Sequence, residues 1–264
     1  MLDLRPAFAE TLCQPDAPHY ATQHARNEKV QCGKPNVYNA WMRKTICMIT
    51  ILIVSGIAHS ASPPNIVFIL ADDLGYGDLG CYGHPSAETP NLDSLARAGV
   101  RMTQHYANGP ECSPTRTALL TGRYQQRVGG LECAIGTGNV GRYDDAIRLA
   151  ASRELGLPSE DTMIPSRLRE AGYRCAIFGK WHLGYEPKFH PMRHGWDDFF
   201  GYLGGNVHYF NHRETSPLHV LFDGELPVYR NGYMTTLITD EAVEFIQSQD
   251  GPFFLFVSHE SPHF

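Results

Sequence analysis

Several classes of protein are excluded by what this 264-residue sequence lacks. Its 22 lysine and arginine residues are outnumbered by 28 aspartate and glutamate residues, and the net charge of −6 gives no reason to expect a nucleic-acid partner. Beyond residue 62 the sequence contains no internal repeat and no low-complexity tract. Hydrophobic residues make up 42% of the chain, which is enough to bury a sizeable core. We therefore expect one large globular domain or two small ones.

The sequence also lacks a hydrophobic run long enough for a convincing membrane span. The candidate run starts with a basic segment at 42–44, continues through apolar residues to Ala58 and ends in small residues before Pro63. This order is typical of a cleaved export signal, which we predict over residues 42–62. No cysteine lies at the cleavage point, so we expect an exported protein, periplasmic or secreted, without a stable membrane anchor.

Residues 1–41, ahead of this signal, show no helical or strand periodicity and are rich in His, Gln, Asn and Pro. Export signals belong at the start of a chain. We therefore predict that residues 1–41 are a mis-called extension of the reading frame or a disordered leader, and that translation starts at Met42. The alternative is a genuine disordered extension followed by an internal signal-anchor.

Cysteine is too scarce for a disulfide scaffold. Of seven cysteines, Cys13, Cys32 and Cys47 precede the expected cleavage point. The mature part keeps Cys81, Cys112, Cys133 and Cys175. Because Cys112 is a candidate for modification, three would remain, and no complete set of disulfides can be drawn.

Three short apolar runs, at residues 65–71, 173–179 and 252–258, predict β-strands. Continuous apolar runs are typical of strands covered on both faces in a parallel sheet. Each run is followed at once by ionisable residues. The carboxyl ends of parallel strands form the edge at which α/β proteins bind ligands, so we expect these residues to meet in one site.

Helical patterns separate the apolar runs, at residues 89–99, 161–171 and 233–247. The alternation of strands and helices predicts an α/β fold with a mostly parallel (mixed) sheet and helices on both faces. The long segments 124–158 and 183–232 have weak periodicity, and we expect loops there that build binding walls or lids.

A reactive residue, a helix end and a positive charge converge at residues 112–123, which read Cys-Ser-Pro-Thr-Arg-Thr-Ala-Leu-Leu-Thr-Gly-Arg. Pro114 suits the first helical position, and Gly122 suits the helix end. Cys112 therefore lies at or just before a helix N-terminus, where free N–H groups and the helix dipole favour an anion. Arg116, one turn later on the same face, directs a fixed positive charge toward that spot.

Two adjacent aspartates, Asp72 and Asp73, follow the first apolar run. Such a pair is most often an ordinary turn. At the ligand-binding edge of a sheet, however, two carboxylates repel each other unless a cation or a proton relieves them. Hard divalent cations choose oxygen ligands, so calcium or magnesium is the natural partner.

The cysteine segment resembles the Cys-x-Pro-x-Arg and Thr-Gly-Arg signature of the type I sulfatases, which belong to the alkaline-phosphatase-like superfamily. Residues 72–78 are similar to the metal-binding segment of that family, and residues 179–184, Gly-Lys-Trp-His-Leu-Gly, are similar to its second signature. The resemblance implies a sulfatase in which a formylglycine-generating or anaerobic maturation enzyme oxidises Cys112 to formylglycine, the nucleophile. Asp72 and Asp73 would hold the metal together with this modified residue.

The resemblance also assigns roles to the remaining polar residues. Lys180 would bind the sulfate, with Arg116 also stabilising its charge, and His182 would contact the formylglycine hydroxyl. His263, in Ser-Pro-His, would act as general acid at the leaving oxygen. His259, four residues earlier, is the alternative candidate for this role. One hydroxyl of the formylglycine hydrate would attack sulfur, and the other would then drive elimination of sulfate. The expected substrate is a small-molecule or carbohydrate sulfate ester.

The family pattern also includes an Asp-Asn metal pair and a further lysine, which this sequence does not supply before Phe264. We therefore interpret residues 63–264 as the N-terminal portion of a sulfatase catalytic domain whose C-terminal part is missing, with the apolar residues 253–256 near an unfinished sheet edge. Two alternatives stay open. One is a phosphodiesterase or phosphonate monoester hydrolase of the same superfamily, and the other is an inactive truncated fragment.

His208 and His212 have the spacing of two metal ligands on a helix. The glycines at 204–205 make a helix doubtful there, and no glutamate or cysteine completes a zinc site. We expect loop histidines near a substrate pocket.

Overall fold

A computed structural model of the chain describes Met42 and residues 62–136, 144–159, 163–214 and 220–263. The predicted leader and nearly all of the predicted export signal lie outside these residues. The chain divides into two units, Met1–Ser60 and Ala61–Phe264, and the following description concerns the second unit. Within the part that the structure describes, no helix has the length and apolar character needed to cross a membrane.

A six-stranded sheet with the strand order β1-β6-β2-β3-β4-β5 forms the centre of the described residues. The strands are β1 (Ile66–Asp72), β2 (Arg174–Lys180), β3 (Asp198–Tyr202), β4 (Phe222–Asp223), β5 (Leu226–Pro227) and β6 (Phe253–Pro262). Strands β1, β6, β2 and β3 run parallel, whereas β4 and β5 continue the sheet in antiparallel fashion. The predicted mostly parallel, mixed sheet is confirmed.

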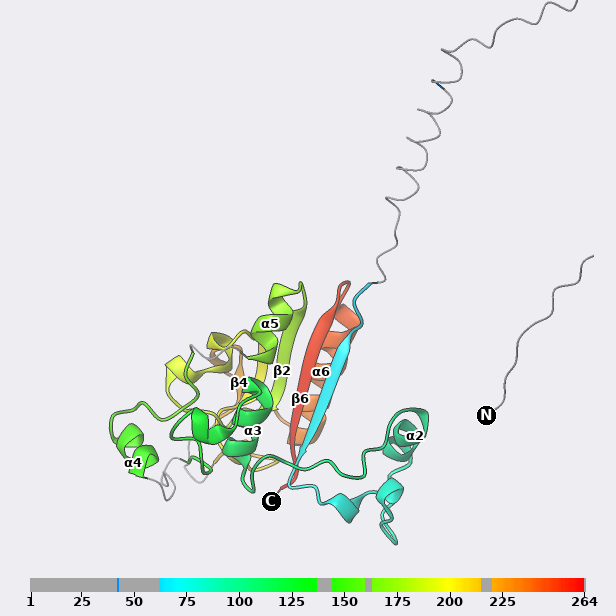
Figure 1. Ribbon diagram of the computed structural model, residues 1–264, viewed down its shortest axis with the longest axis horizontal. Helices are drawn as coiled ribbons and strands as arrows, with labels where there is room; N and C mark the ends of the chain where they lie inside the picture. The colour runs from blue at the N-terminus through cyan, green and yellow to red at the C-terminus, as the bar shows by residue number, and fades with distance from the viewer. Residues whose placement is uncertain (1–41, 43–61, 137–143, 160–162, 215–219, 264) are drawn as a thin grey trace, which may run out of the picture. The chain divides into compact units, whose positions relative to one another are not determined.

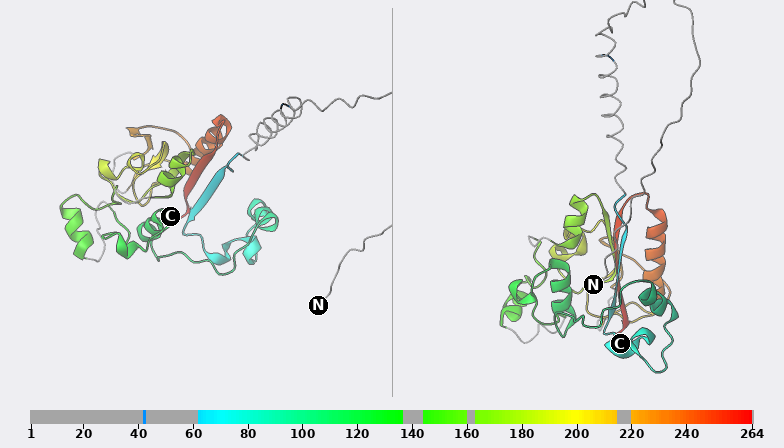
Figure 2. Two further views of the ribbon diagram at one scale, coloured as in Figure 1. Left: turned by 45° about the horizontal axis from the view of Figure 1, so that its top comes forward. Right: turned by 45° about the vertical axis from the view of Figure 1, so that its right-hand side comes forward.

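Helices lie on both faces of the sheet, as predicted. Helix α6 (Met234–Ser248) packs against β6 and β2 on one face, whereas α3 (Cys112–Thr121) and α5 (Ile164–Glu170) lie on the other (Figure 1, Figure 2). The remaining described α-helices are α2 (Pro90–Ala98) and α4 (Asp144–Ala151). Short 3-10 turns connect them: η1 (Tyr76–Asp78), η2 (Gly80–Tyr82), η3 (Gln125–Arg127), η4 (Pro187–Phe189) and η5 (Pro191–Arg193).

Strand β6 contributes to the hydrophobic core on both sides of the sheet. Phe253, Leu255 and Val257 join the core cluster that contains α6, and Phe254 and Phe256 join the cluster on the opposite face. This division follows from the alternation of side chains along a strand. All five are at most 4% exposed. The expectation that these phenylalanines lie near an unfinished sheet edge is wrong, because β6 is an inner strand between β1 and β2 (Figure 1).

Strand β1 is the edge strand instead. Val67, Phe68 and Ile69 are 47%, 38% and 61% exposed. The apolar run at 65–71 predicted a strand covered on both faces, and that prediction is wrong. Among the described residues, β1 pairs only with β6, so one of its sides and much of its surface stay open.

The predicted helices correspond to α2, α5 and α6, with ends that differ by no more than a few residues. The segments predicted as loops contain more structure than expected. Strand β3 was missed because its apolar run is short and interrupted by Gly201. Helix α4 was missed because it spans only eight residues, Asp144–Ala151, beside a glycine-rich stretch.

Candidate active site

The ionisable residues that follow the strands meet at one edge of the sheet, as predicted. Strand β1 ends at Asp72, β2 ends at Lys180, and β6 ends just before His263. Helix α3 brings Cys112 to the same edge, where its Sγ lies 3.3 Å from Lys180 Nζ. Possible ligand atoms of Asp72, Cys112 and His263 lie within 4.8 Å of one another.

Helix α3 begins at Cys112, which confirms the prediction from the sequence. Glu111 precedes it in an extended conformation, with φ of −130°. Gly122 ends the helix in the left-handed conformation, with φ of 66°, and its N–H donates to the carbonyl oxygen of Ala118 at 2.9 Å. Pro114 is the third helical residue rather than the first, a position where the missing N–H has no intrahelical partner either.

Arg116 connects α3 to three strands of the sheet. Its Nη1 donates to the carbonyl oxygen of Lys180 at 2.8 Å and to Ser258 Oγ at 2.6 Å, and its Nη2 lies 3.4 Å from Asp72 Oδ1. The side chain is only 2% exposed. A guanidinium suits this position because it carries several donors in one plane. Ser258 was not identified from the sequence, where it is merely the last residue of an apolar run.

Lys180 is the second buried cation of the site. Its side chain is fully buried, its Nζ contacts Asp72 Oδ2, and the same ammonium donates to Cys112 Sγ at 3.3 Å. Burial by itself raises the pKa of Asp72. The positive charges of Arg116 and Lys180 outweigh this effect and hold the pKa below its ordinary value. Asp72 is therefore an ionised carboxylate at neutral pH.

His182 lies just past β2, in a left-handed backbone conformation with φ of 58°. Its Nε2 contacts the carbonyl oxygen of Ile135, and its buried Nδ1 has no hydrogen-bond partner among the described residues. Burial, reinforced by the charge of Lys180, lowers the pKa of His182 to about 3, so the ring is neutral at physiological pH.

Ser113, the second residue of α3, ties the helix start to this histidine. Its Oγ donates to the carbonyl oxygen of His182 at 2.9 Å and accepts the N–H of Ile135 at 3.2 Å. The serine is fully buried. It occupies an unspecified position of the cysteine signature, so the sequence offered no signal for it.

His263 reaches the site through its backbone. Its N–H donates to the carbonyl oxygens of Asp72, at 3.1 Å, and Glu260, at 2.9 Å. The carboxylate of Asp73 is 61% exposed and lies 3.6 Å from His263 Nε2. Among the described residues, the ligand cluster thus contains His263 in place of the expected Asp73. His259, the competitor of His263, lies within β6 and outside this cluster.

The residues at this edge fit a divalent cation. Asp72 offers an ionised carboxylate, and the Sγ of Cys112 stands where the oxygen atoms of a formylglycine would lie. His263 brings a third possible ligand atom within 4.8 Å of those of Asp72 and Cys112. A set of oxygen ligands suits a hard cation such as calcium or magnesium.

His208 and His212 are loop residues, as expected from the upstream glycines. His208 is exposed, and its Nδ1 accepts the N–H groups of Phe210 and Asn211 at 3.2 and 3.3 Å. His212 is 1% exposed, and its Nε2 lies 3.1 Å from the carbonyl oxygen of Gly232. Neither belongs to the metal-ligand cluster found in the described part of the chain.

This combination of a mixed α/β sheet and a cysteine, two cations and a carboxylate at its carboxyl edge is matched by a known family. A sequence model of the family described as Sulfatase covers residues 64–264. The chain therefore belongs to the sulfatase family, whose fold is alkaline-phosphatase-like.

Particular relatives are similar over most of this chain. N-acetylgalactosamine-6-sulfatase of Mus musculus is 38% identical over 222 residues, which cover 78% of this chain and 41% of the relative. Arylsulfatase A of Bos taurus is 45% identical over 155 residues, which cover 58% of this chain and 28% of the relative. The chain thus spans less than half the length of these curated relatives.

Solved structures show the same fold. The crystal structure of Ps i-CgsB superposes with a TM-score of 0.66 at 32% identity, covering 76% of this chain and 46% of that one. A structure described as a complex with its substrate D-glucosamine-2-N,6-O-disulfate has a TM-score of 0.59 at 26% identity, covering 76% of this chain and 35% of that one.

Proposed function

We propose that the protein hydrolyses sulfate esters, with Cys112 matured to formylglycine as the nucleophile. The observation that carries this proposal is the convergence of Cys112, Arg116 and Lys180 around Asp72, from three separate elements of the chain, α3, β2 and β1, at the carboxyl edge of the sheet. A family member with this constellation is equipped for sulfuryl transfer rather than for simple anion binding.

Local charge supports a sulfate substrate. The site places two buried cations, Arg116 and Lys180, beside one buried carboxylate, Asp72, although the whole chain carries a net charge of −6. The positive excess attracts the sulfate group. Buried and fixed, both cations also stabilise the charge that develops on the sulfuryl oxygens, because no reorganisation is needed during the reaction.

The two histidines take different roles in this proposal. His182 is neutral at physiological pH, and its unpartnered Nδ1 can exchange a hydrogen bond with a hydroxyl of the nucleophile. His263 lies among the residues that surround Cys112, and it donates a proton to the leaving oxygen.

We also propose a divalent cation, calcium or magnesium, held by Asp72, Asp73 and the modified Cys112, with His263 close by. When bound, such an ion lowers the pKa of a coordinated hydroxyl and neutralises sulfate oxygens. Asp72 is ionised and buried, so it is the natural first ligand. Asp73 follows Asp72 at the end of β1, and its exposed carboxylate lies 3.6 Å from His263 Nε2, which supports its role as a further ligand.

Maturation and location follow from the sequence patterns. The Cys-Ser-Pro-Thr-Arg segment at 112–116 is the substrate proposed for a formylglycine-generating or anaerobic maturation enzyme. The signal-like segment at 42–62 favours an exported protein, periplasmic or secreted. The proposed substrate is a small-molecule or carbohydrate sulfate ester, in line with the relatives named above.

The proposal is tested with paired esters. The protein, produced with a maturation enzyme and calcium, is assayed on para-nitrophenyl sulfate, para-nitrophenyl phosphate and bis-para-nitrophenyl phosphate, with Cys112→Ala as the inactive control. A preference for the sulfate that depends on Cys112 is expected. A preference for the phosphodiester would identify a phosphodiesterase of the same superfamily, and a folded, matured protein without turnover on any ester would identify an inactive fragment.

A further inference from the structure

His263 lies one residue beyond the end of β6, so strand pairing alone does not fix its position. Its N–H donates to the carbonyl oxygens of Asp72 and Glu260. On its other side, the carbonyl oxygen of His263 accepts the hydroxyl of Tyr209 at 2.5 Å. The backbone of the proposed general acid is thus held from two sides, and the proposed reaction assigns no role to the tyrosine.

Tyr209 belongs to the loop that follows β3, and both its ring and its backbone are fixed. The ring stacks on that of Tyr233, with a centroid distance of 5.3 Å and an interplanar angle of 28°. The carbonyl oxygen of Tyr209 accepts the N–H of Met234, the first residue of α6, at 2.8 Å. Because the ring is already held, its hydrogen bond to His263 costs little additional conformational entropy.

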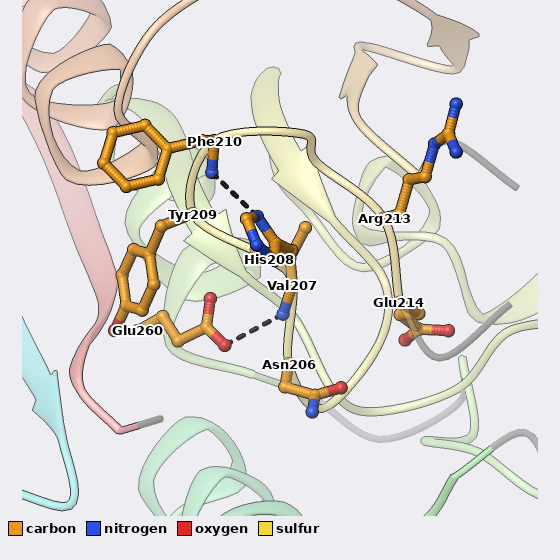
Figure 3. A pocket seen from close by; sticks show the side chains of 8 residues that line it. All are labelled: Asn206, Val207, His208, Tyr209, Phe210, Arg213, Glu214 and Glu260. Carbon is orange, nitrogen blue, oxygen red and sulfur yellow. Dashed lines mark hydrogen bonds between the residues drawn. The ribbon is translucent and has the colours of Figure 1, made fainter. Parts of the chain in front are cut away.

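Glu260 fastens the loop around Tyr209 to β6. Its side chain is buried, its Oε1 accepts the N–H of Val207 at 2.8 Å, and its Oε2 accepts the hydroxyl of Tyr202 at 3.2 Å. Val207, Tyr209 and Glu260 line one pocket of 410 Å³, and the dashed line between Val207 and Glu260 in Figure 3 is the first of these two bonds. The fold itself therefore places Tyr209 beside the end of β6.

The hydroxyl of Tyr209 is oriented by a second hydroxyl. Ser261 Oγ donates to it at 3.4 Å, and Ser261 Oγ lies 2.8 Å from Thr235 Oγ1 of α6. Burial raises the pKa of Tyr209 above its ordinary value, so the hydroxyl keeps its proton at neutral pH. With Ser261 as its donor, the tyrosine oxygen directs its own proton to the carbonyl oxygen of His263.

The position of His263 matters because a general acid works only within hydrogen-bond reach of the atom that it protonates. A displacement of about 1 Å is enough to slow such a step strongly. A phenylalanine at position 209 would keep the stacked ring but remove the donor from the carbonyl oxygen of His263. The histidine could then shift away from the leaving oxygen.

We propose that Tyr209 is a positioning residue for the reaction, and that its hydroxyl holds His263 where the histidine can protonate the leaving oxygen. The inference rests on the proposed function and on the role of His263 in it. Tyr209 acts through His263 and not on the ester itself. Its effect should therefore depend on how much the leaving group needs a proton.

The test compares two leaving groups of different basicity on the matured, metal-loaded protein. Phenoxide is more basic than para-nitrophenoxide, so cleavage of phenyl sulfate depends more strongly on a general acid. Tyr209→Phe should lower kcat/KM about tenfold for phenyl sulfate and less than about threefold for para-nitrophenyl sulfate. A merely structural defect would lower both values by the same factor.

Tyr233→Phe is the matched control. It removes a hydroxyl from the ring that stacks on Tyr209, and this residue is 39% exposed. Both kcat/KM values should stay within about twofold of those of the unsubstituted protein. Thermal unfolding followed by circular dichroism verifies that both variants are folded.

A double-mutant cycle asks whether Tyr209 acts through His263. The substitution Tyr209→Phe is introduced into the His263→Ala protein, and kcat/KM for phenyl sulfate is measured at high enzyme concentration. The second substitution should now change kcat/KM by less than about twofold, because the group that the hydroxyl positions is already gone.

The possible results separate this inference from the proposed function. Equal losses on the two esters in Tyr209→Phe, a loss no larger than that in Tyr233→Phe, or the same loss with and without His263 would each refute the positioning role and leave the sulfatase function standing. A matured, unsubstituted protein that hydrolyses neither ester would refute the sulfatase function, and the inference would fail with it.

Discussion

At the scale of single residues, Arg116 shows how one side chain can hold a site together. Its guanidinium contacts the carbonyl oxygen of Lys180, Ser258 Oγ and the carboxylate of Asp72, which belong to three adjacent strands. Each partner requires a donor in a different direction. Positive charge alone therefore does not explain why an arginine occupies this position. The fork of donors on the guanidinium is needed as well.

Arg116→Lys tests this argument, because it keeps the charge and removes the fork of donors. We expect sulfate-ester turnover to fall at least about a hundredfold, because a lysine ammonium cannot reach all three partners and Asp72 would lose its orientation. Steady-state kinetics measures the loss. Arg148→Lys is the control, because that side chain is 68% exposed, and it should change turnover by less than about twofold. Similar rates for both variants would contradict the role of the fork.

Cys112 is expected to carry formylglycine when the protein is made with a maturation enzyme. Its place at the start of α3, beside Lys180, motivates this prediction. Mass spectrometry of the tryptic peptide from Met102 to Arg116 should show the loss of sulfur and the gain of oxygen. The peptide from Val128 to Arg142, which contains Cys133, should keep its thiol and serves as the internal control. An intact thiol at Cys112 would refute the proposed nucleophile.

At the scale of elements, the end of α3 depends on one backbone conformation. Gly122 adopts φ of 66°, a region that residues with a Cβ rarely occupy, and an added Cβ would meet no atom within 4 Å. A substitution there therefore measures backbone strain without a steric clash.

Gly122→Ala should lower the free energy of unfolding by about 1 kcal/mol, the usual cost of placing a side chain in the left-handed region. Urea titration followed by circular dichroism measures this change. Gly251→Ala is the matched control, since Gly251 also has open space around its Cβ direction but no positive φ. Equal losses in the two variants would show that the helix end carries no strain.

The segment around η5 contains a buried titratable ring. His194 is 2% exposed and stacks on Trp181 with a centroid distance of 5.5 Å. Burial, with a smaller contribution from the charge of His190, lowers the pKa of His194 from 6.5 to about 4. The folded protein therefore holds this ring neutral at pH values where the unfolded chain protonates it.

This difference predicts a loss of stability in acid. The contribution of His194 is fully present above pH 6.5 and decreases as the pH falls toward 4, because the unfolded state then binds the extra proton. The loss amounts to about 3 kcal/mol in order of magnitude. His194→Phe should flatten the dependence of unfolding free energy on pH between 7.5 and 5, measured in urea. His105→Phe, at an exposed histidine, should leave the slope as it is, and an unchanged slope in both would contradict the prediction.

At the scale of the whole molecule, the exposed apolar surface of β1 favours self-association of the chain. Val67, Phe68 and Ile69 lie on an edge strand that pairs on one side only among the described residues. Exposed apolar edges are templates for association with other chains. The exposed apolar sheet edge that the sequence placed near residues 253–256 thus lies at β1 rather than at β6.

The 264-residue chain should therefore self-associate in a concentration-dependent way, and Ile69→Lys should reduce this association. A charge on an edge strand disfavours pairing with another strand, and Ile69 is 61% exposed, so the lysine can be solvated. Size-exclusion chromatography with light scattering measures the mass. Leu95→Lys, at a 67% exposed position on α2, is the control. A monomeric wild-type chain at all concentrations would show that this edge does not drive association.

Local signals in the sequence determined many structural features of this protein. The apolar runs, the helix start at Cys112 and its end at Gly122, and the ionisable residues after each strand could all be predicted. So could the family, because the signatures at 112–123 and 179–184 are contiguous. These features depend on neighbours within a few residues, where propensity, capping and spacing act directly.

Only the tertiary structure decided which residues face each other. The order of the strands placed β6 inside the sheet and β1 at its edge, although both read as buried apolar runs. It also brought Ser258 to Arg116 and Glu260 to the loop after β3. Strand order is set by pairings between segments far apart in the chain, and the hydrophobic pattern of one strand carries no information about its neighbour.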